Sequence, residues 1–215
     1  MKLNPNIKFY LVIGSENCTH HSLFDIVAMA VNNGVDIIQL REKNASTEKI
    51  VQIGNTIQPF LKIHNIPLII NDNIEAAKIL DADGVHVGQH DTAYKTARKF
   101  LGSNKIIGLS IENATQIDML KQYNDVDYIG IGPIFSTNTK KDAAKPLGIT
   151  SLKKIRQMAN IPVFAIGGID LNNINDVMQT GVQGAAIVSA ICNAENPNEV
   201  CKNFKKNFCH KEFDG

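Results

Sequence analysis

Residues 35–65, VDIIQLREKNASTEKIVQIGNTIQPFLKIHN, contain one complete strand-then-helix unit, and its repetition decides the fold. The unit begins with the apolar run 35–40, typical of a strand buried on both faces. It continues with a helix-like segment at 46–65, which starts with a Ser cap and carries an acidic residue in its first turn. Pro59 predicts a kink or a break within this helix.

The same alternation of strand and helix occurs eight times along the chain. Apolar runs, mostly rich in Ile and Val, occupy residues 9–14, 35–40, 67–72, 84–88, 105–110, 127–134, 162–169 and 184–191. Helix-like segments follow at 22–34, 46–65, 73–83, 92–102, 113–124, 150–160, 171–181 and 196–208. Successive βαβ units predict a parallel sheet, either open and doubly wound or closed. The count of eight and the length of 215 residues favour an α/β fold of the (β/α)8 TIM-barrel type, with residues 1–215 as a single domain.

The composition indicates an ordinary globular protein and excludes several classes. Hydrophobic residues make up 44% of the chain, charged residues 20%, and the formal net charge is +1, so no global field favours nucleic acid or a membrane surface. No apolar run approaches the length of a membrane helix, and the N-terminus lacks a secretory signal pattern. The four cysteines form no C-x-x-C pair, which predicts reduced thiols in a cytoplasmic protein. The sequence is compatible with a homo-oligomer.

Polar residues stand at the ends of the predicted strands, where barrels of this class carry their active sites. Side chains alternate along a strand, so the end of the second strand presents one polar face made of Gln39, Arg41 and Lys43. Cations seldom face an interior, and this face therefore indicates a function at the barrel mouth.

The charges at these ends suggest a site for a diphosphate with Mg²⁺. Arg41, Lys43 and Lys140 suit phosphate oxygens. Asp72 and Asp91 offer the oxygen ligands that Mg²⁺ prefers.

The late strand ends indicate a second anion site. Gly168 lies at the end of the seventh predicted strand, and Val188 with Ser189 lies at the end of the eighth, in a pattern like the phosphate cradle of such barrels. Thr137 and Thr139 would add hydroxyl donors. Two anion sites at one mouth imply two phosphorylated small-molecule substrates or one bisphosphate.

Each residue also has a simpler interpretation. Arg41 and Lys43 could form a solvated loop, and Asp72 could cap the third helix. His86 alternates within its strand, which favours a hydrogen-bonded polar residue inside the barrel over a catalytic one. The placement of the polar residues at successive strand ends favours a shared site.

The segments QLREK, ND, DGVHVGQHD, GLS, DYIGIGPIFSTNTKKDA, IPVFAIGGI and GAAIVSAI resemble the thiamine-phosphate synthase family in order and spacing, over residues 9–192. The resemblance implies a (β/α)8 barrel that joins 4-amino-2-methyl-5-(diphosphooxymethyl)pyrimidine to 4-methyl-5-(2-phosphoethyl)thiazole, with Mg²⁺ as cofactor. It also implies a dissociative reaction, in which diphosphate leaves before the thiazole nitrogen attacks.

The resemblance further implies roles for individual residues. The pyrimidine diphosphate would be bound by Gln39, Leu40, Arg41, Glu42, Lys43, Asn71, Ser110 and Lys140. Among these, the catalytic residues would be Arg41, Lys43 and Lys140. The thiazole phosphate would be bound by Thr137, Asn138, Thr139, Gly168, Val188 and Ser189. Mg²⁺ would be bound by Asp72 and Asp91.

The chain departs from the family pattern at two places. The first strand ends in GSEN, where the family often has a Thr-Asp pair, and Glu16 is a candidate substitute. Ser136 stands where proline is common. Two alternative functions remain: a thiazole tautomerase of the same superfamily, which would not need the diphosphate-binding set, and a non-catalytic barrel that binds a phosphorylated ligand.

Overall fold

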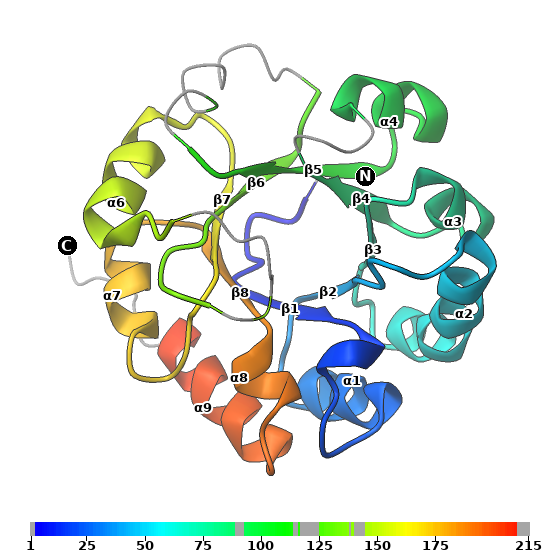
Figure 1. The fold of residues 1–215 in the computed structure, drawn as a ribbon, viewed down its shortest axis with the longest axis horizontal. Coiled ribbons are helices and arrows are strands. Elements are labelled where there is room, and N and C mark those ends of the chain that lie inside the picture. The colour runs from blue at the N-terminus through cyan, green and yellow to red at the C-terminus, as the bar shows by residue number, and fades with distance from the viewer. Residues whose placement is uncertain are drawn as a thin grey trace.

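The computed structural model describes residues 3–88, 93–113, 116, 125–137, 139 and 145–209. Its strands form a closed parallel barrel in which each pairs with its neighbours in chain order and β8 returns to β1 (Figure 1). The strands are β1 Phe9–Ile13, β2 Ile37–Leu40, β3 Leu68–Asn71, β4 Gly84–Val87, β5 Ile106–Ile111, β6 Tyr128–Ile131, β7 Val163–Ile166 and β8 Gly184–Ile187. The predicted (β/α)8 barrel is therefore confirmed, and each predicted run coincides with one strand, although β5 extends one residue beyond its run.

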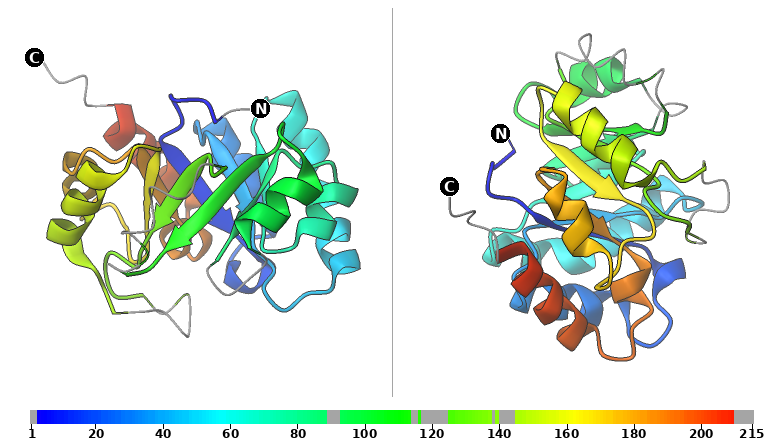
Figure 2. Two further views of the ribbon diagram at one scale, coloured as in Figure 1. Left: turned by 90° about the horizontal axis from the view of Figure 1, so that it is seen from above. Right: turned by 90° about the vertical axis from the view of Figure 1, so that its left-hand side faces the viewer.

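The helices surround the barrel and cover the outer face of its sheet (Figures 1 and 2). They are α1 Leu23–Asn32, α2 Thr47–Ile63, α3 Ile74–Ile79, α4 Tyr94–Leu101, α6 Gly148–Met158, α7 Ile174–Gln179, α8 Ser189–Cys192 and α9 Pro197–Cys209, with a 3-10 turn, η1, at Ser15–Asn17. The helix expected at 113–124 lies almost wholly outside the described residues. Among the described helices, none has both the length and the apolar content needed to span a bilayer.

Three details of the helices and strands either differ from the sequence prediction or choose between its alternatives. The last strand is shorter than predicted, because Ser189 already begins α8. Helix α2 continues through Pro59. The cap of α3 is Asn73, whose side chain accepts a hydrogen bond from the Ala76 N–H at 2.7 Å, so Asp72 is not needed for capping.

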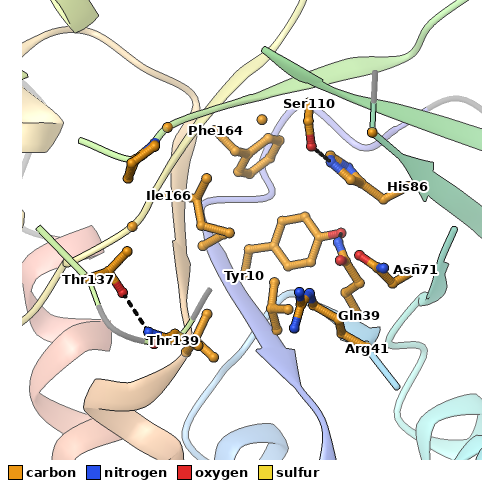
Figure 3. A pocket seen from close by; sticks show the side chains of 18 of the residues that line it. Tyr10, Gln39, Arg41, Asn71, His86, Ser110, Thr137, Thr139, Phe164 and Ile166 are labelled. Carbon is orange, nitrogen blue, oxygen red and sulfur yellow. Dashed lines mark hydrogen bonds between the residues drawn. The ribbon is translucent and has the colours of Figure 1, made fainter. Parts of the chain in front are cut away.

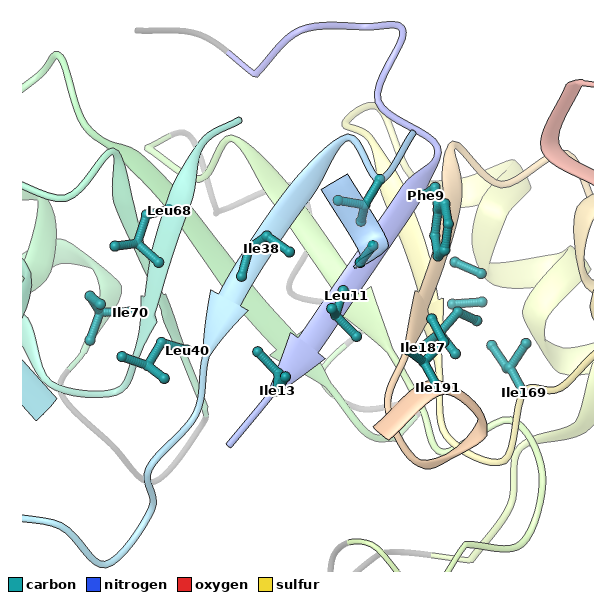
Figure 4. Close-up of a cluster of buried hydrophobic side chains, with 14 of the residues drawn as sticks. Phe9, Leu11, Ile13, Ile38, Leu40, Leu68, Ile70, Ile169, Ile187 and Ile191 are labelled. Atoms are coloured by element: carbon teal, nitrogen blue, oxygen red, sulfur yellow. The ribbon is translucent and has the colours of Figure 1, made fainter. Parts of the chain in front are cut away.

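Apolar side chains fill two layers, one on each side of the sheet. The outer layer packs the strands against the helices and includes Leu11, Ile38 and Leu40 (Figure 4). The inner layer fills the barrel and includes Tyr10, Ile37, Ile69, Ile106, Tyr128 and Phe164. Because side chains alternate along each strand, neighbouring residues such as Leu40 and Gln39 serve opposite faces.

A polar side chain just before each even-numbered strand ties that strand to a neighbour at the N-terminal end of the barrel. Aspartates hold this position before three strands: Asp36 before β2, Asp83 before β4 and Asp127 before β6. Each carboxylate accepts a backbone N–H at the beginning of the preceding strand, at 2.8 Å. Gln183, before β8, instead donates to the carbonyl oxygen of Ile7 at 3.1 Å and so links β8 to the segment leading into β1.

The cysteines that the structure describes with their side chains are free thiols, as predicted: Cys18, Cys192 and Cys201. Burial raises the pKa of the Cys18 thiol to about 11, with a smaller contribution from the carboxylate of Glu42. A raised pKa keeps this thiol protonated at neutral pH and therefore unreactive.

We expect Asp83→Ala to lower the free energy of unfolding by roughly 1–3 kcal/mol, because it leaves the partly buried Leu68 N–H without its acceptor. Asp81→Asn is the control: it removes only a surface ion pair with Lys105, and asparagine tolerates the positive φ of 50° at this position. Urea denaturation of both variants measures the difference. Equal losses would contradict the role given to Asp83.

Candidate active site

The C-terminal ends of the strands surround a cavity of about 260 Å³ at the barrel mouth (Figure 3). Side chains or backbone from all eight strands or the loops that follow them contribute to its lining. Its floor is aromatic and apolar, formed by Tyr10, Tyr128, Phe164 and Ile166, and polar groups surround the floor. A cavity of this kind suits a small ligand with a ring and charged substituents.

Most of the site residues predicted from the sequence meet in this one cavity. It is lined by Gln39, Arg41, Lys43, Asn71, Asp72, Ser110, Thr137, Thr139, Gly168, Val188 and Ser189. Asp91, Asn138 and Lys140 lie outside the described residues. The polar face predicted at the end of β2 exists, because Gln39, Arg41 and Lys43 all reach the same cavity.

Leu40 and Glu42 are placed away from the cavity, unlike the rest of the set predicted with them. Leu40 is fully buried in the outer layer between the sheet and the helices (Figure 4). The carboxylate of Glu42 accepts hydrogen bonds from the backbone N–H and the hydroxyl of Ser15, each at 2.6 Å. Neither residue lines the cavity, because strand alternation turns both side chains away from the mouth, and binding of the pyrimidine diphosphate by Leu40 and Glu42 stays a prediction.

The loop after β1 contributes an acid next to Arg41. The Glu16 carboxylate lies 3.5 Å from a terminal nitrogen of Arg41, whose side chain is 15% exposed. The Arg41 backbone N–H donates to the carbonyl oxygen of Ile13 at 2.8 Å, which continues the β1–β2 ladder. Glu16 thus steadies the guanidinium at the mouth, and an anionic ligand can take over part of this pairing.

Asp72 occupies an unusual backbone conformation directly after β3. Its φ is 61°, in the left-handed region that non-glycine residues rarely adopt, and its N–H donates to the carbonyl oxygen of His86 at 2.8 Å. The Asn71 amide donates to the Asp72 carboxylate at 2.5 Å. Strained backbone that neighbouring hydrogen bonds hold in place is typical of functional positions.

The donor set at Asp72 fits a hard cation such as Mg²⁺. One or two carboxylates with substrate phosphates and waters are the usual Mg²⁺ environment, and the Asp72 carboxylate and the Asn71 amide oxygen are of this kind. Among the described residues, no group of three or more His, Cys, Asp and Glu side chains could hold a metal by itself. The donor set therefore favours a cation that is bound together with a phosphorylated ligand.

A buried chain of hydrogen bonds crosses the barrel below the mouth, and the sequence did not predict it. The Gln39 amide donates to the Tyr10 hydroxyl at 2.7 Å, and the Tyr10 and Tyr128 hydroxyls lie 2.7 Å apart. The Tyr128 hydroxyl lies 3.0 Å from His86 Nδ1, and His86 Nε2 lies 2.9 Å from the Ser110 hydroxyl (Figure 3). His86 is the hydrogen-bonded polar residue inside the barrel that its alternation predicted.

Burial keeps the two tyrosines of this chain neutral. Loss of solvent raises the pKa of Tyr10 and of Tyr128 well above the ordinary value of a phenol. Both hydroxyls therefore remain hydrogen-bond donors at neutral pH. Two aromatic residues within apolar strands are typical of a core, so only their contacts reveal a polar role.

The opposite side of the cavity is formed by hydroxyls and backbone. The Thr137 hydroxyl accepts a hydrogen bond from the Thr139 N–H at 3.2 Å, and both residues line the cavity (Figure 3). Gly168 has a φ of 66°, and a Cβ there would lie 2.6 Å from the Ser136 carbonyl oxygen. Only glycine fits this close approach, and Val188 and Ser189 complete the wall at the beginning of α8.

A family model described as thiamine monophosphate synthase matches residues 9–191. The thiamine-phosphate synthase of Leptospira biflexa is 37% identical over 202 residues, which cover 93% of this chain and 96% of the relative. That of Vibrio campbellii is 44% identical over 172 residues, covering 80% and 84%. Among solved structures, a thiamine phosphate pyrophosphorylase from Pyrococcus furiosus aligns with a TM-score of 0.85 at 30% identity, covering 95% of this chain and 96% of that one.

We expect Gly108→Ala to disturb the cavity from below. A Cβ at Gly108 would lie 2.2 Å from Tyr128 Cζ and 2.5 Å from His86 Nδ1, so both rings must move. Such overpacking costs roughly 1–3 kcal/mol of unfolding free energy. Gly130→Ala is the control, because its Cβ would approach His86 no closer than 3.1 Å. Thermal or urea unfolding should rank Gly108→Ala as the less stable variant, and the reverse order would contradict the packing described here.

Proposed function

Because the chain belongs to the thiamine monophosphate synthase family, we propose that its barrel mouth condenses 4-amino-2-methyl-5-(diphosphooxymethyl)pyrimidine with 4-methyl-5-(2-phosphoethyl)thiazole. Formation of thiamine phosphate, a group transfer, is the activity of this family. The observation that supports the substrate assignment is that two chemically different sets of groups, both suited to anions, line one cavity. Cations and a carboxylate come from the ends of β2 and β3, and hydroxyls with glycine backbone come from the loops after β6, β7 and β8.

The pyrimidine diphosphate belongs on the β2–β3 side. Arg41 and Lys43 supply positive charge for the diphosphate oxygens, and the planar guanidinium can bind two of them at once. Lys140, a residue outside the described ranges, is proposed as a third cation on the basis of the family motif. Gln39, Asn71 and Ser110 line the same cavity, where they can hold the polar edge of the pyrimidine ring.

Mg²⁺ belongs beside Asp72, with the diphosphate supplying further oxygen ligands. Asp91 is proposed as the second carboxylate from its motif position, 19 residues after Asp72 (91 − 72 = 19). When bound, the ion would supply positive charge that stabilises the departing diphosphate.

The thiazole phosphate belongs on the opposite side. Thr137 and Thr139 offer hydroxyl donors, and the backbone at Gly168, Val188 and Ser189 can approach phosphate oxygens closely. Asn138 joins this set from the sequence motif alone. The two phosphate groups then lie on opposite sides of the cavity, which leaves the ring portions of the two substrates between them.

The reaction proposed needs no protein nucleophile. The bond between the pyrimidine methylene carbon and the diphosphate oxygen breaks, and its electron pair leaves with the diphosphate. The lone pair of the thiazole nitrogen then forms the new C–N bond, which gives thiamine phosphate and diphosphate. Arg41 and Lys43 stabilise the charge that develops on the leaving group, and the walls of the cavity hold the reacting atoms in line.

The two alternatives predict results different from those of the condensation, so one assay separates all three. We expect diphosphate release only when both substrates and Mg²⁺ are present. A tautomerase would convert a thiazole phosphate without any pyrimidine, and a non-catalytic barrel would bind ligand without releasing diphosphate. Either result would overturn the condensation.

We expect Arg41→Ala to lower kcat by on the order of 10²–10³-fold, because a donor aimed at the developing charge is lost. The exposed residue Lys153 on α6 provides a control, since Lys153→Ala removes a cation that does not line the cavity. Steady-state rates of diphosphate release measure the effect, and circular dichroism checks the fold. A rate near that of the unchanged protein would contradict the role of Arg41.

We expect Asp72→Asn to raise the Mg²⁺ concentration needed for half-maximal turnover and to lower the maximal rate. Asparagine is the informative substitution, because it tolerates the φ of 61° while removing the carboxylate charge. Asp176→Asn, on the exposed face of α7, is the matched control. If chelation followed by Mg²⁺ titration gave the same curve for both variants, Asp72 would not be a metal ligand.

A further inference from the structure

The chain Gln39–Tyr10–Tyr128–His86–Ser110 joins two sides of the cavity through the barrel interior. It links the end of β2 to β5 by way of β1, β6 and β4, so each of its five residues comes from a different strand. Tyr10 and Tyr128 are 1% and 0% exposed. Their rings are held edge-on to Phe164, with centroids 5.5 and 5.4 Å away. The tyrosine hydroxyls are thus fixed in position by packing as well as by hydrogen bonds.

The contacts give the chain a direction. An amide nitrogen can only donate, so Tyr10 accepts from Gln39 and must send its own proton elsewhere. Its neighbour for that proton is the Tyr128 oxygen at 2.7 Å. The opposite direction would leave the Tyr10 proton buried without an acceptor, which is unfavourable. Tyr10 therefore donates to Tyr128, and Tyr128 donates to His86 Nδ1.

The direction determines the state of His86. A ring nitrogen that accepts a hydrogen bond carries no proton, so neutral His86 holds its proton on Nε2. That nitrogen lies 2.9 Å from the Ser110 hydroxyl and donates to it. With His86 as its donor, Ser110 directs its own proton toward an acceptor other than His86.

We propose that Tyr10 and Tyr128 are positioning residues that fix the Nε2–H tautomer of His86 and thereby set the Ser110 hydroxyl as a donor to the substrate. The part that concerns substrate rests on the proposed function. The ligand atom at Ser110 must then be a hydrogen-bond acceptor, such as a ring nitrogen or a phosphate oxygen. The tautomer of His86 is inferred from the hydrogen bonds of Gln39, Tyr10 and Tyr128, and this inference needs no substrate.

The first test reads the tautomer directly. In protein with ¹⁵N-labelled histidine, the imidazole nitrogen shifts should report His86 protonated at Nε2, with His86→Asn identifying its signals. Tyr128→Phe should shift His86 toward the Nδ1–H tautomer, and Tyr10→Phe should do so more weakly. Phe164→Leu is the control, since it loosens the same packing but removes no hydroxyl, and it should leave the tautomer unchanged. An Nδ1–H tautomer in the unchanged protein, or no response to Tyr128→Phe, would overturn the proposal.

The second test separates positioning from simple stability. We expect Tyr128→Phe to lower kcat by about threefold to tenfold, the range for one net hydrogen bond. In a Ser110→Ala background the same change should have no further effect, because the chain acts through that hydroxyl. Additive losses in the two backgrounds would contradict the proposal. Absence of condensation by the unchanged protein would instead contradict the proposed function and leave the tautomer result standing.

Discussion

A closed ring of strands must fill its interior with side chains, and two glycines determine the filling of this barrel. Gly108 on β5 and Gly130 on β6 leave the space that Tyr128 and His86 occupy. A Cβ at Gly108 would overlap with both rings, so the hydrogen bond between Tyr128 and His86 requires glycine at this position. The interior is therefore apolar at the N-terminal end and becomes polar just below the mouth. The floor of the active site is also the packed core of the barrel, and the site inherits its rigidity.

Strand alternation made much of the fold and part of the site predictable. Runs rich in Ile and Val located the eight strands, because parallel strands covered on both faces need apolar residues at nearly every position. The period of two placed Gln39, Arg41 and Lys43 on one face, and the structure confirms that they share a cavity. The same period turns Leu40 and Glu42 outward. Their inclusion came from the motif as a block of sequence, and the alternation within it places their side chains away from the cavity.

Other features depend on geometry that no local pattern contains. Asp72 and Asn73 are both good helix caps, and only the backbone shows that Asn73 caps α3 while Asp72 lies at positive φ. The Tyr10–Tyr128 contact joins residues 118 positions apart, and either residue alone is typical of a core. Sequence reasoning could place His86 inside the barrel, but its partners come from β5 and β6. Asp91, Asn138 and Lys140 lie outside the described residues, so their roles are predicted from the sequence alone.

The polar ties at the N-terminal end of the barrel have a consequence for ligand binding. The ties of Asp36, Asp83 and Asp127 join residues 15 to 28 positions apart, whereas the bond from Gln183 to Ile7 spans 176. Closing the ring between β8 and β1 therefore confines the longest loop of chain and has the largest entropic cost. Ser189 lies on the β8 side of this closure, at the beginning of α8. Glu16, which follows β1, and its partner Arg41, which follows β2, lie on the β1 side. A ligand that contacts both sides would stabilise the pairing of β8 with β1. Ligand binding and the free energy of separating these two strands are then thermodynamically linked.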